Sequence, residues 1–520
     1  MSRKSTVSAP PNPAELTGAV SRRYLIVALV AWLLCSALFF DPKPDTGGDN
    51  AVYLALAEAI ATGRGFRDIH IVGSPDHLQY PVGFPVVLAL LRLVLGSTSV
   101  LAAKLLVWLS SLGAVWFGWL VLKRLFRRRA GPVLLALVSL PLLVRAGHQV
   151  LTEMPFLCAS LAALHFALRA EDEHPRWYLP AVLLAVGALL LRTAGIGLVA
   201  GLGLGLLVRR RWSWLALLAV LAAAVIVPGQ VRAAAAGQNG TYLDLFLARH
   251  PYIAEYGRMG PLDLAARAWD NFTVYAFTVA PEALVPLLED LRRPVVTTVI
   301  GGLLAVLMLL GLWTRLRRRT ALEGYALAGG LLLLAWPQLW AGDRFLVPLL
   351  PLLVIYLFFG LDWLGGRLKW RRLALAGTAG LVVLNAGAVA VRAARTVPDN
   401  LCWLRGDEYA GYSQDWRRYF EVLDWVRENV APDKVVLARK PEFVWLWTGR
   451  QSLCYPFTDE RARVRAAADR ADFILFDNFQ WTRTTRDFLN PVLQEDPPRY
   501  PVVLETEPPQ FYLLRVEHGQ

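Results

Sequence analysis

Long apolar runs separated by short polar segments dominate the chain from residue 24 to residue 391. Runs of about 18 or more apolar residues are typical of helices that cross a membrane. The pattern therefore predicts a polytopic α-helical membrane protein. We expect about eleven spans, in the ranges 24–40, 100–122, 132–144, 153–170, 179–191, 195–208, 214–231, 295–313, 322–340, 345–361 and 373–391.

The hydrophobic pattern changes after residue 415. Trp416 to Val430 has helical periodicity, and short apolar runs near residues 434, 471, 500 and 511 are strand-like, with a helix expected over 461–470. This alternation is typical of a small α/β domain. We divide the chain into a tail, a membrane domain with two outer loops, and a soluble domain, at residues 1–23, 24–392 (loops 41–99 and 232–293) and 393–520.

Charge sets the expected orientation. The chain carries 54 Lys and Arg against 41 Asp and Glu, and the basic residues cluster between apolar spans. Positive loops stay in the cytoplasm, so Arg22 and Arg23 place the N-terminus inside and the first loop and C-terminal domain outside. The run 81–95 is short and carries Arg92, so we interpret it as a juxtamembrane or re-entrant helix. Attraction to anionic lipid explains the positive charge, and no nucleic-acid partner is expected.

Several enzyme and pump classes lack their signatures here. The sequence has no Gly-Lys-Ser/Thr phosphate loop, no Gly-x-Ser-x-Gly and no Cys/His metal-ligand spacing. Of the four cysteines, Cys35 and Cys158 lie in apolar runs, where packing explains them. Cys402 and Cys454 lie in the polar C-terminal part, where pairing and two free thiols are both open.

The first outer loop concentrates candidate chemistry around Asp49. Gly47 and Gly48 allow a tight turn before it. Residues 50–61 then read as an amphipathic helix that lies on the bilayer surface, with Asp49 at its N-terminus. The simplest interpretation is that Asp49 only caps this helix.

Further ionisable residues gather at the outer ends of the predicted spans. Such residues are costly near the hydrocarbon region, so they pair or have a function. Together they suit one reaction: a carboxylate takes a proton from an acceptor hydroxyl, and fixed cations hold a phosphate leaving group. The alternative for each residue is an ion pair with a snorkelling Arg or Lys. The candidates are Asp49, Glu153, Arg344, Arg192 and Arg64, with His77, Tyr80 and His148 as acceptor or loop support.

Four motifs, in this order and topology, carry a family resemblance. Gly47-Gly48-Asp49-Asn50-Ala-Val-Tyr53 with Gly63-Arg64-Gly65-Phe66, Gln79-Tyr80-Pro81-Val82-Gly83-Phe84-Pro85, Thr152-Glu153-Met154-Pro155-Phe156 and Asp343-Arg344-Phe345 resemble GT-C superfamily glycosyltransferases. The similar branch contains the dolichyl-phosphate-mannose–protein mannosyltransferases and lipid A aminoarabinose transferases. The chain departs from it at Val82, where a second proline is frequent, and at Asn50, where some members have a second acid.

The resemblance implies an inverting transfer of a sugar from a polyprenyl-phosphate donor to an acceptor hydroxyl, on the outer face of a bacterial inner membrane. Asp49 matches the catalytic Asp, Glu153 the second acidic position, and Arg344 the basic position near the lipid phosphate. No cofactor is required, and a divalent cation held by Glu153 is an option. The acceptor is a glycan, a lipid or a protein.

Two other functions are compatible with a polytopic chain. A transporter or flippase of lipid-linked sugars would carry ionisable residues near mid-membrane and paired halves, whereas here they sit at span ends without an internal repeat. A non-catalytic receptor would use the C-terminal domain for binding, and it would leave Asp49 and Glu153 without a role.

Overall fold

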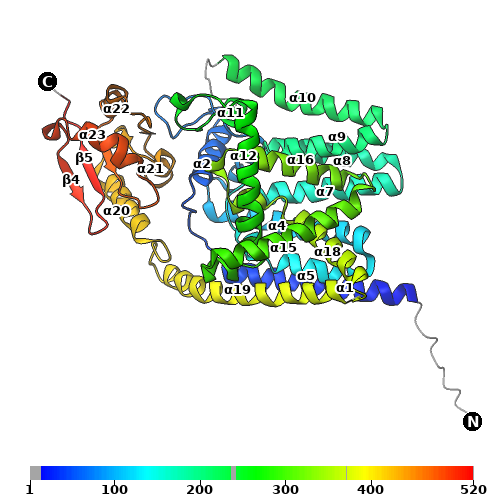
Figure 1. Ribbon diagram of the computed structural model, residues 1–520. Helices are drawn as coiled ribbons and strands as arrows, with labels where there is room; N and C mark the ends of the chain where they lie inside the picture. Colours follow the sequence, from blue (N-terminus) through cyan, green and yellow to red (C-terminus); the bar gives the residue numbers. More distant parts are fainter. Residues whose placement is uncertain (1–12, 236–241, 371, 519–520) are drawn as a thin grey trace, which may run out of the picture.

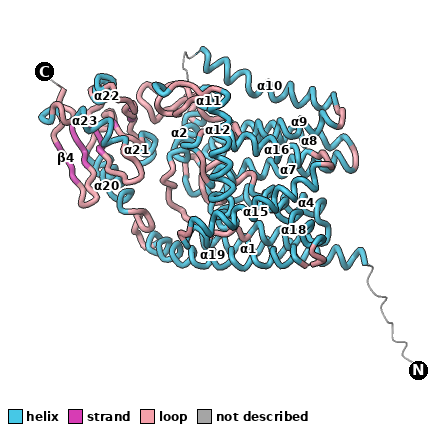
Figure 2. The backbone as a smooth tube through the Cα atoms, viewed as in Figure 1, coloured by secondary structure: helices cyan, strands magenta, loops and turns pink. Residues whose placement is uncertain are grey.

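The computed structural model describes residues 13–235, 242–370 and 372–518. Helices make up most of these ranges, and the strands are confined to the C-terminal part (Figure 2). Six described helices are long and apolar enough to cross a membrane: α1 (Pro13–Phe39), α4 (Val100–Phe126), α10 (Trp212–Ala235), α15 (Pro294–Leu316), α18 (Leu350–Arg367) and α19 (Leu373–Leu404). The chain is therefore a multi-pass helical protein, while the expected total of about eleven spans stays a prediction.

Seven further described helices complete the bundle. They are α3 (Gly83–Leu95), α5 (Ala130–Val138), α6 (Pro141–Ala146), α7 (Glu153–Asp172), α8 (Tyr178–Leu191), α9 (Gly195–Val208) and α16 (Ala321–Ala335). Helices α9 and α16 approach so closely that a Cβ on Gly201 would overlap the Tyr325 backbone, and one on Gly324 would overlap Gly201. Small residues permit such contacts in membrane helices, where packing and not water expulsion drives association. The helix α3 has 13 residues, about 20 Å at 1.5 Å per residue.

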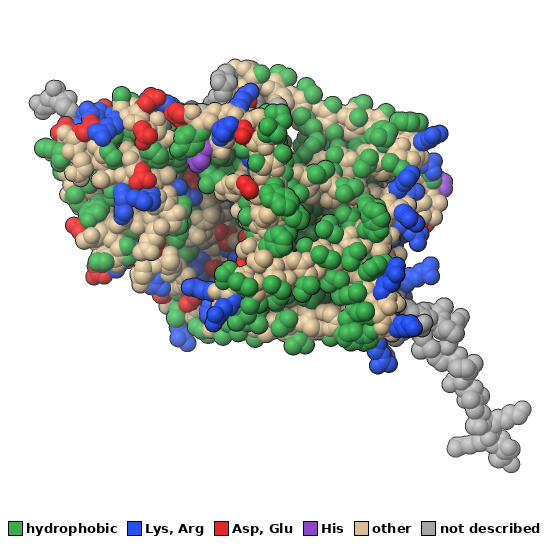
Figure 3. All heavy atoms as spheres, in the orientation of Figure 1, with side chains coloured by type: hydrophobic (Ala, Val, Ile, Leu, Met, Phe, Trp, Pro, Cys, Tyr) green, Lys and Arg blue, Asp and Glu red, His purple; other side chains and the backbone are tan. Residues whose placement is uncertain are grey.

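The surface of the bundle is apolar between two polar ends. Figure 3 shows hydrophobic side chains along the helices and a cluster of Lys and Arg at the end away from the C-terminal domain. At the opposite end, helix α12 (Pro261–Val274) runs across the ends of the bundle helices (Figure 1). It belongs to the region 232–293, whose described part also forms α11 (Tyr242–Leu247), α13 (Ala280–Leu284) and α14 (Leu287–Leu291). The described part of this region is thus mostly helical.

The helix after Asp49 does not lie on a bilayer surface, which corrects the sequence prediction. Helix α2 (Gly48–Ala61) buries Tyr53, Leu54 and Ala57 in the core of the membrane bundle and Ala51 in the core of the C-terminal domain. Figure 1 places α2 between these two parts of the molecule. Small residues on one side and large apolar residues on the other allow a helix to pack on both faces.

The C-terminal part folds as an α/β unit reached through α19. This helix continues past residue 392, the expected domain boundary, to Leu404. The described helices that follow are α20 (Gln414–Asn429), α21 (Pro441–Thr448), α22 (Arg461–Ala468) and α23 (Asn490–Leu493), and the strands are β1 (Val436–Leu437), β2 (Ser452–Leu453), β3 (Phe473–Phe476), β4 (Val502–Glu505) and β5 (Tyr512–Arg515). The sequence pattern located four of these strands and missed β2, which is only two residues long.

One mixed sheet joins these strands in the order β2-β1-β3-β5-β4. Strand β1 runs parallel to β2 and β3, while β5 is antiparallel to β3 and β4. The first outer loop extends the sheet at its β2 edge, because Ile71 forms a parallel bridge with Ser452. The Ser452 amide donates to the His70 carbonyl at 3.0 Å, and the Val72 amide donates to the Ser452 carbonyl at 3.2 Å. An edge strand offers unpaired backbone groups for such pairing.

All four cysteines are free. Cys35 and Cys158 are half-buried, as expected for packing residues, whereas Cys402 and Cys454 are exposed. Of the two alternatives for the C-terminal pair, the structure has the two free thiols.

Candidate active site

Asp49 stands in the first turn of α2 but does not cap it. The N-cap position is Gly47, and the structure gives it no side-chain capping bond. Instead, Asp49 Oδ1 accepts a hydrogen bond from the Tyr80 hydroxyl at 2.8 Å, and its Oδ2 lies 2.6 Å from Arg344 Nη2. The interpretation of Asp49 as only a helix cap is therefore wrong.

A histidine holds the backbone and the ring of Tyr80 in place. His77 Nε2 accepts from the Tyr80 amide at 2.8 Å, while His77 Nδ1 contacts Asp68 Oδ1 at 2.8 Å. The His77 and Tyr80 rings also stack, with centroids 5.2 Å apart. His77 is therefore a loop-support residue that positions the side chain bonded to Asp49.

Four charged side chains from distant parts of the sequence form one connected set, which we call the outer network: Asp49, Arg344, Glu153 and Arg192. Arg344 bridges the two acids, since its Nη2 contacts Asp49 and its Nε donates to Glu153 Oε1. Arg192 Nη1 lies 2.6 Å from the same Glu153 oxygen. The network has no net charge, and its carboxylate–guanidinium contacts are charge-assisted.

Burial differs sharply across the outer network. The Glu153 side chain is 2% exposed and Arg192 is 10% exposed, whereas Asp49 and Arg344 are each 31% exposed. Burial alone lowers the pKa of a guanidinium, but the Glu153 and Asp49 carboxylates outweigh it and raise the pKa of Arg344 above its ordinary value. Arg344 therefore stays cationic, and Asp49 and Arg344 are the accessible members.

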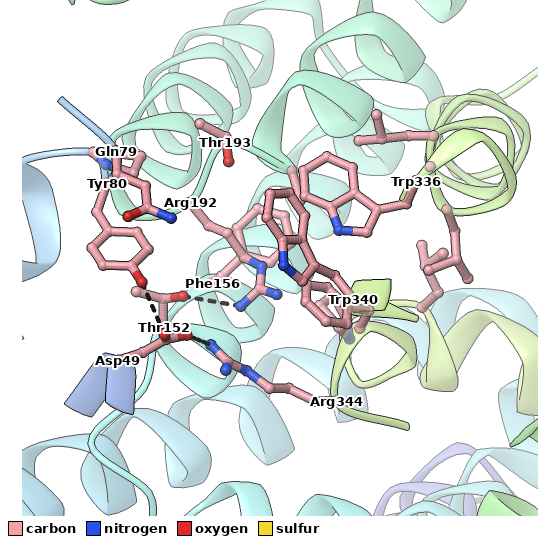
Figure 4. A pocket seen from close by; sticks show the side chains of 18 of the residues that line it. Asp49, Gln79, Tyr80, Thr152, Phe156, Arg192, Thr193, Trp336, Trp340 and Arg344 are labelled. Atoms are coloured by element: carbon pink, nitrogen blue, oxygen red, sulfur yellow. Dashed lines mark hydrogen bonds and ion pairs between the residues drawn. The ribbon is translucent and has the colours of Figure 1, made fainter. Parts of the chain in front are cut away.

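A cavity of about 290 Å³ opens beside this network. Figure 4 shows Asp49 and Tyr80 on one side, Trp336 and Trp340 on the other, and Arg192 and Arg344 between them. The remaining wall is mostly apolar and comes largely from α16 and the segment after Arg344. It contains Tyr325, Gly329, Leu332, Leu333, Phe345, Pro348 and Leu349. A polar end with an apolar wall suits a ligand that is part anion and part hydrocarbon.

The structure brings together most of the predicted site residues. Asp49, Tyr80, Arg192 and Arg344 line the cavity, and Glu153 lies behind the two guanidiniums without lining it. Two predicted residues lie elsewhere. Arg64 is exposed beyond the far end of α2, about 20 Å along the helix at 1.5 Å per residue. His148 is buried with its ring against Phe40, at 5.4 Å between centroids.

Sequence reasoning missed several contributors. Thr152 lines the cavity and accepts from Arg192 Nη1 at 3.1 Å, and its place beside Glu153 was the available signal. Trp336, Trp340 and Tyr252 read as ordinary aromatics at a membrane interface.

Two residues of α21 and its approach, Lys440 and Glu442, lie against the start of α2. A Cβ on Gly48 would overlap the Glu442 carboxylate. Burial raises the pKa of Glu442, with Lys440 opposing the shift and Asp49 adding to it. No local sequence pattern connects these residues with Asp49.

Glu153 faces two guanidiniums through Oε1, and the cation that the sequence allows at this carboxylate stays a prediction. Arg344 occupies the position between Asp49 and Glu153, so no metal cation bridges these two acids in the structure. Within the described ranges, no group of three or more His, Cys, Asp or Glu side chains is arranged to hold a metal ion. We therefore derive the chemistry of the site from its guanidiniums.

Comparison with protein families gives one match. Residues 79–231 match the model described as dolichyl-phosphate-mannose-protein mannosyltransferase. This range includes Tyr80, Glu153 and Arg192 but neither Asp49 nor Arg344. None of the curated proteins compared with the sequence is similar enough to count as a relative.

Solved structures match almost the whole chain. ArnT from Cupriavidus metallidurans in the apo state is 15% identical, covers 96% of this chain and 98% of its own, and has a TM-score of 0.59. The same protein bound to undecaprenyl phosphate is 16% identical over the same shares, with a TM-score of 0.56. The Archaeoglobus fulgidus oligosaccharyltransferase in complex with Zn and sulfate is 13% identical, covers 95% of this chain and 73% of its own, and scores 0.56. The chain thus has the fold of GT-C glycosyltransferases, as its motifs predicted.

Proposed function

We propose that this chain is an integral membrane glycosyltransferase that moves a sugar from a polyprenyl-phosphate donor to an acceptor hydroxyl. The observation that carries the proposal is the placement of Asp49, Arg192 and Arg344 around one cavity with a mostly apolar wall. The matched family model names a dolichyl-phosphate-mannose enzyme, and a structure of the same fold was solved with undecaprenyl phosphate. Both support a lipid phosphate at this site.

In the proposed reaction, the acceptor oxygen attacks C1 of the donor sugar while Asp49 takes the hydroxyl proton. The bond between C1 and the phosphate oxygen breaks, and its electron pair remains on the lipid phosphate. Attack opposite the leaving group inverts the configuration at C1. Arg344 and Arg192 stabilise the phosphate charge that develops, as fixed cations do at other leaving groups.

The ion pair between Arg344 and Asp49 adds one step to the proposed reaction. Arg344 holds Asp49 Oδ2 at 2.6 Å, so that oxygen is engaged before the donor arrives. A donor phosphate competes with the carboxylates for the two guanidiniums. Movement of Arg344 toward the phosphate frees Asp49 Oδ2 to accept the proton. Glu153 then acts as a positioning residue, since it touches both guanidiniums from behind the cavity wall.

The apolar wall accounts for the lipid part of the donor. Leu332, Leu333 and Leu349 lie on the side of the cavity formed by α16 and the start of α18. Isoprenyl units that leave the phosphate along this wall stay in an apolar environment. We place the reaction on the outer face of a bacterial inner membrane, because the basic clusters gather at the opposite end of the bundle (Figure 3).

The test is sugar release by purified protein from a panel of polyprenyl-phosphate sugars, with Asp49→Asn compared with wild type. The amide keeps the shape of the side chain and loses the base, so transfer falls by about 10²–10⁴-fold while donor binding persists. Asp76→Asn is the matched control, because Asp76 is also an arginine-paired acid of the first loop, 3.1 Å from Arg67, but lies outside the cavity. Full activity in Asp49→Asn contradicts the mechanism. If the wild-type protein binds the lipid tightly and releases sugar from none of the donors, a flippase is favoured.

A further inference from the structure

The C-terminal domain presents a group of polar and aromatic side chains where two neighbouring parallel strands end. We call it the strand-end cluster: Arg439, Lys440, Asp477, Trp481 and Thr484. Arg439 and Lys440 follow β1, and Asp477 directly follows β3. The order β2-β1-β3 means that the chain leaves β1 toward one edge of the sheet and leaves β3 toward the other. Open α/β sheets bind ligands at such a switch point, at the carboxyl ends of the strands.

The contacts within the strand-end cluster leave hydrogen-bonding groups available. The Arg439 guanidinium lies 4.4 Å from the centre of the Trp481 ring, and its Nε donates to Thr484 Oγ1 at 2.6 Å. No ion pair of Arg439 is present within the described ranges, so its Nη atoms carry no carboxylate partner. Asp477, at the end of the neighbouring strand β3, is buried, and its Oδ2 accepts a hydrogen bond from the Thr485 hydroxyl at 2.8 Å.

Trp481 keeps a large part of its ring in solvent. Its side chain is 51% exposed although the domain has an extensive aromatic core. Asn478 and Gln480, on the same loop after β3, are also exposed. An exposed aromatic ring beside an arginine and side-chain amides provides an apolar face with hydrogen-bonding groups around it. Sugar rings match this combination, since they have apolar C–H faces and a rim of hydroxyls.

The strand-end cluster adjoins the cavity through two routes. Lys440 Nζ lies 3.0 Å from the point that a Cβ on Gly48, the residue before Asp49, would occupy. Phe457 connects the other side, with its ring 5.6 Å from the Arg439 guanidinium and 6.4 Å from the ring of Tyr252, which lines the cavity. A ligand held at Trp481 therefore extends along these residues toward Asp49.

From this placement we infer that the strand-end cluster is a binding site for a saccharide, and that the acceptor is a glycan whose reactive hydroxyl reaches Asp49 while a neighbouring sugar stacks at Trp481. This inference rests on the proposed function and narrows its acceptor from glycan, lipid or protein to a glycan. A membrane anchor does not explain the cluster as well, because Lys440 faces the start of α2 between the two domains and not an outer surface.

The experiment uses the full-length protein in nanodiscs on an array that carries bacterial envelope oligosaccharides and, beside them, peptides. Trp481→Ala and Arg439→Met are compared with wild type and with Arg483→Ala, a matched control two residues along the same loop whose side chain is 74% exposed. We expect wild type and Arg483→Ala to bind the same saccharides. Both cluster variants lose at least about tenfold in affinity, equal to about 1.4 kcal/mol.

Asp49→Asn separates this inference from the proposed function. Its array pattern stays equal to that of wild type, because binding at Trp481 does not need the base. Saccharide binding that is unchanged in both cluster variants overturns the inference, and so does binding to peptides alone. Saccharide binding that depends on Trp481 supports the binding site. If sugar release does not depend on Asp49 in the same protein, the glycosyltransferase mechanism is rejected while the binding site stands.

Discussion

The two ends of the helical bundle each contain a group of ion-paired side chains, and the two groups have different roles. The outer network joins Asp49, Arg344, Glu153 and Arg192 beside a cavity. We call the other the inner network: it consists of two ion pairs, Arg209–Glu171 and Arg315–Glu323, whose acids both bond to the start of α16. It lies where α7, α9, α15 and α16 meet at the end rich in Lys and Arg.

The acids of the inner network accept hydrogen bonds from backbone amides. Glu323 Oε2 accepts from the Thr320 amide at 2.9 Å in the capping box that starts α16, and Glu171 Oε1 accepts from the Ala321 amide at 2.9 Å. None of its members lines the cavity. Capping satisfies amides that a helix start leaves unpaired. A charged residue at the end of a span is thus structural where it bonds to the backbone at a helix start. It is available for chemistry where it faces a cavity and pairs only with other side chains.

The largest expected effect comes from breaking each network at one arginine. Arg344→Met removes a phosphate-binding group from the cavity, so transfer falls by about 10²–10³-fold, while Glu153 keeps Arg192 as a partner. Arg315→Met leaves Glu323 Oε1 without its guanidinium, 3.0 Å away in wild type, in a side chain 3% exposed. This costs roughly 3 kcal/mol or more of stability and leaves the turnover of folded protein intact.

Thermal unfolding in detergent and sugar release from the same preparations check this pair. The comparison fails if Arg344→Met lowers the unfolding temperature as much as Arg315→Met does, or if Arg315→Met abolishes transfer in protein that is still folded.

A second prediction concerns the backbone that carries Asp49. Gly48→Ala introduces a Cβ that overlaps the Glu442 carboxylate, whereas a Cβ on Gly47 meets nothing within 4 Å. Either the buried Glu442 side chain or the first turn of α2 must then shift, and a shift of the turn misplaces the base and lowers transfer by roughly 10²-fold. Gly47→Ala is the matched control and keeps wild-type activity. Recovery of activity in the double variant Gly48→Ala/Glu442→Ala identifies the steric clash as the cause of the loss. If the double variant stays inactive, the clash is not the cause.

The pH dependence of loop docking is a smaller effect. Burial lowers the pKa of His70 from 6.5 to about 4, with Asp68 opposing the shift and His77 adding to it. Between these values the opened loop binds more protons than the docked loop, so docking on β2 weakens as pH falls from about 6.5 to about 4. Hydrogen exchange at the Val72 and Ser452 amides should speed up over this range beyond its intrinsic pH dependence. In His70→Asn we expect hydrogen exchange to follow only its intrinsic pH dependence. If the additional acceleration persists in this variant, another group causes it.

The smallest expected effect is that of a chelator. Because Arg344 occupies the position between Asp49 and Glu153, the outer network needs no divalent cation to balance its acids. Sugar release in EDTA should equal that in buffer, with added Mg²⁺ or Mn²⁺ giving no stimulation. Loss of transfer in EDTA and its return with one metal would show that a cation enters when the donor binds.

Local patterns in the sequence were sufficient for part of this site. Asp49, Glu153, Arg192 and Arg344 were singled out because ionisable residues at span ends are costly and rare, and all four meet in one network. The same rule included Arg64, which is exposed, and His148, which packs against Phe40. The rule identifies an end of the bundle, and it does not distinguish a cavity wall from its surroundings.

The amino-acid sequence by itself determined the multi-pass helical part, most elements of the α/β part, and the set of charged residues available at each end, because these follow from hydrophobic period and local composition. Only the tertiary structure decided that α2 is buried between two domains, that Glu153 lies behind two arginines, and that Glu442 contacts Gly48. These outcomes depend on contacts between residues as far apart as Asp49 and Arg344. Such contacts are set by how helices and domains pack, and no local period in the chain records them.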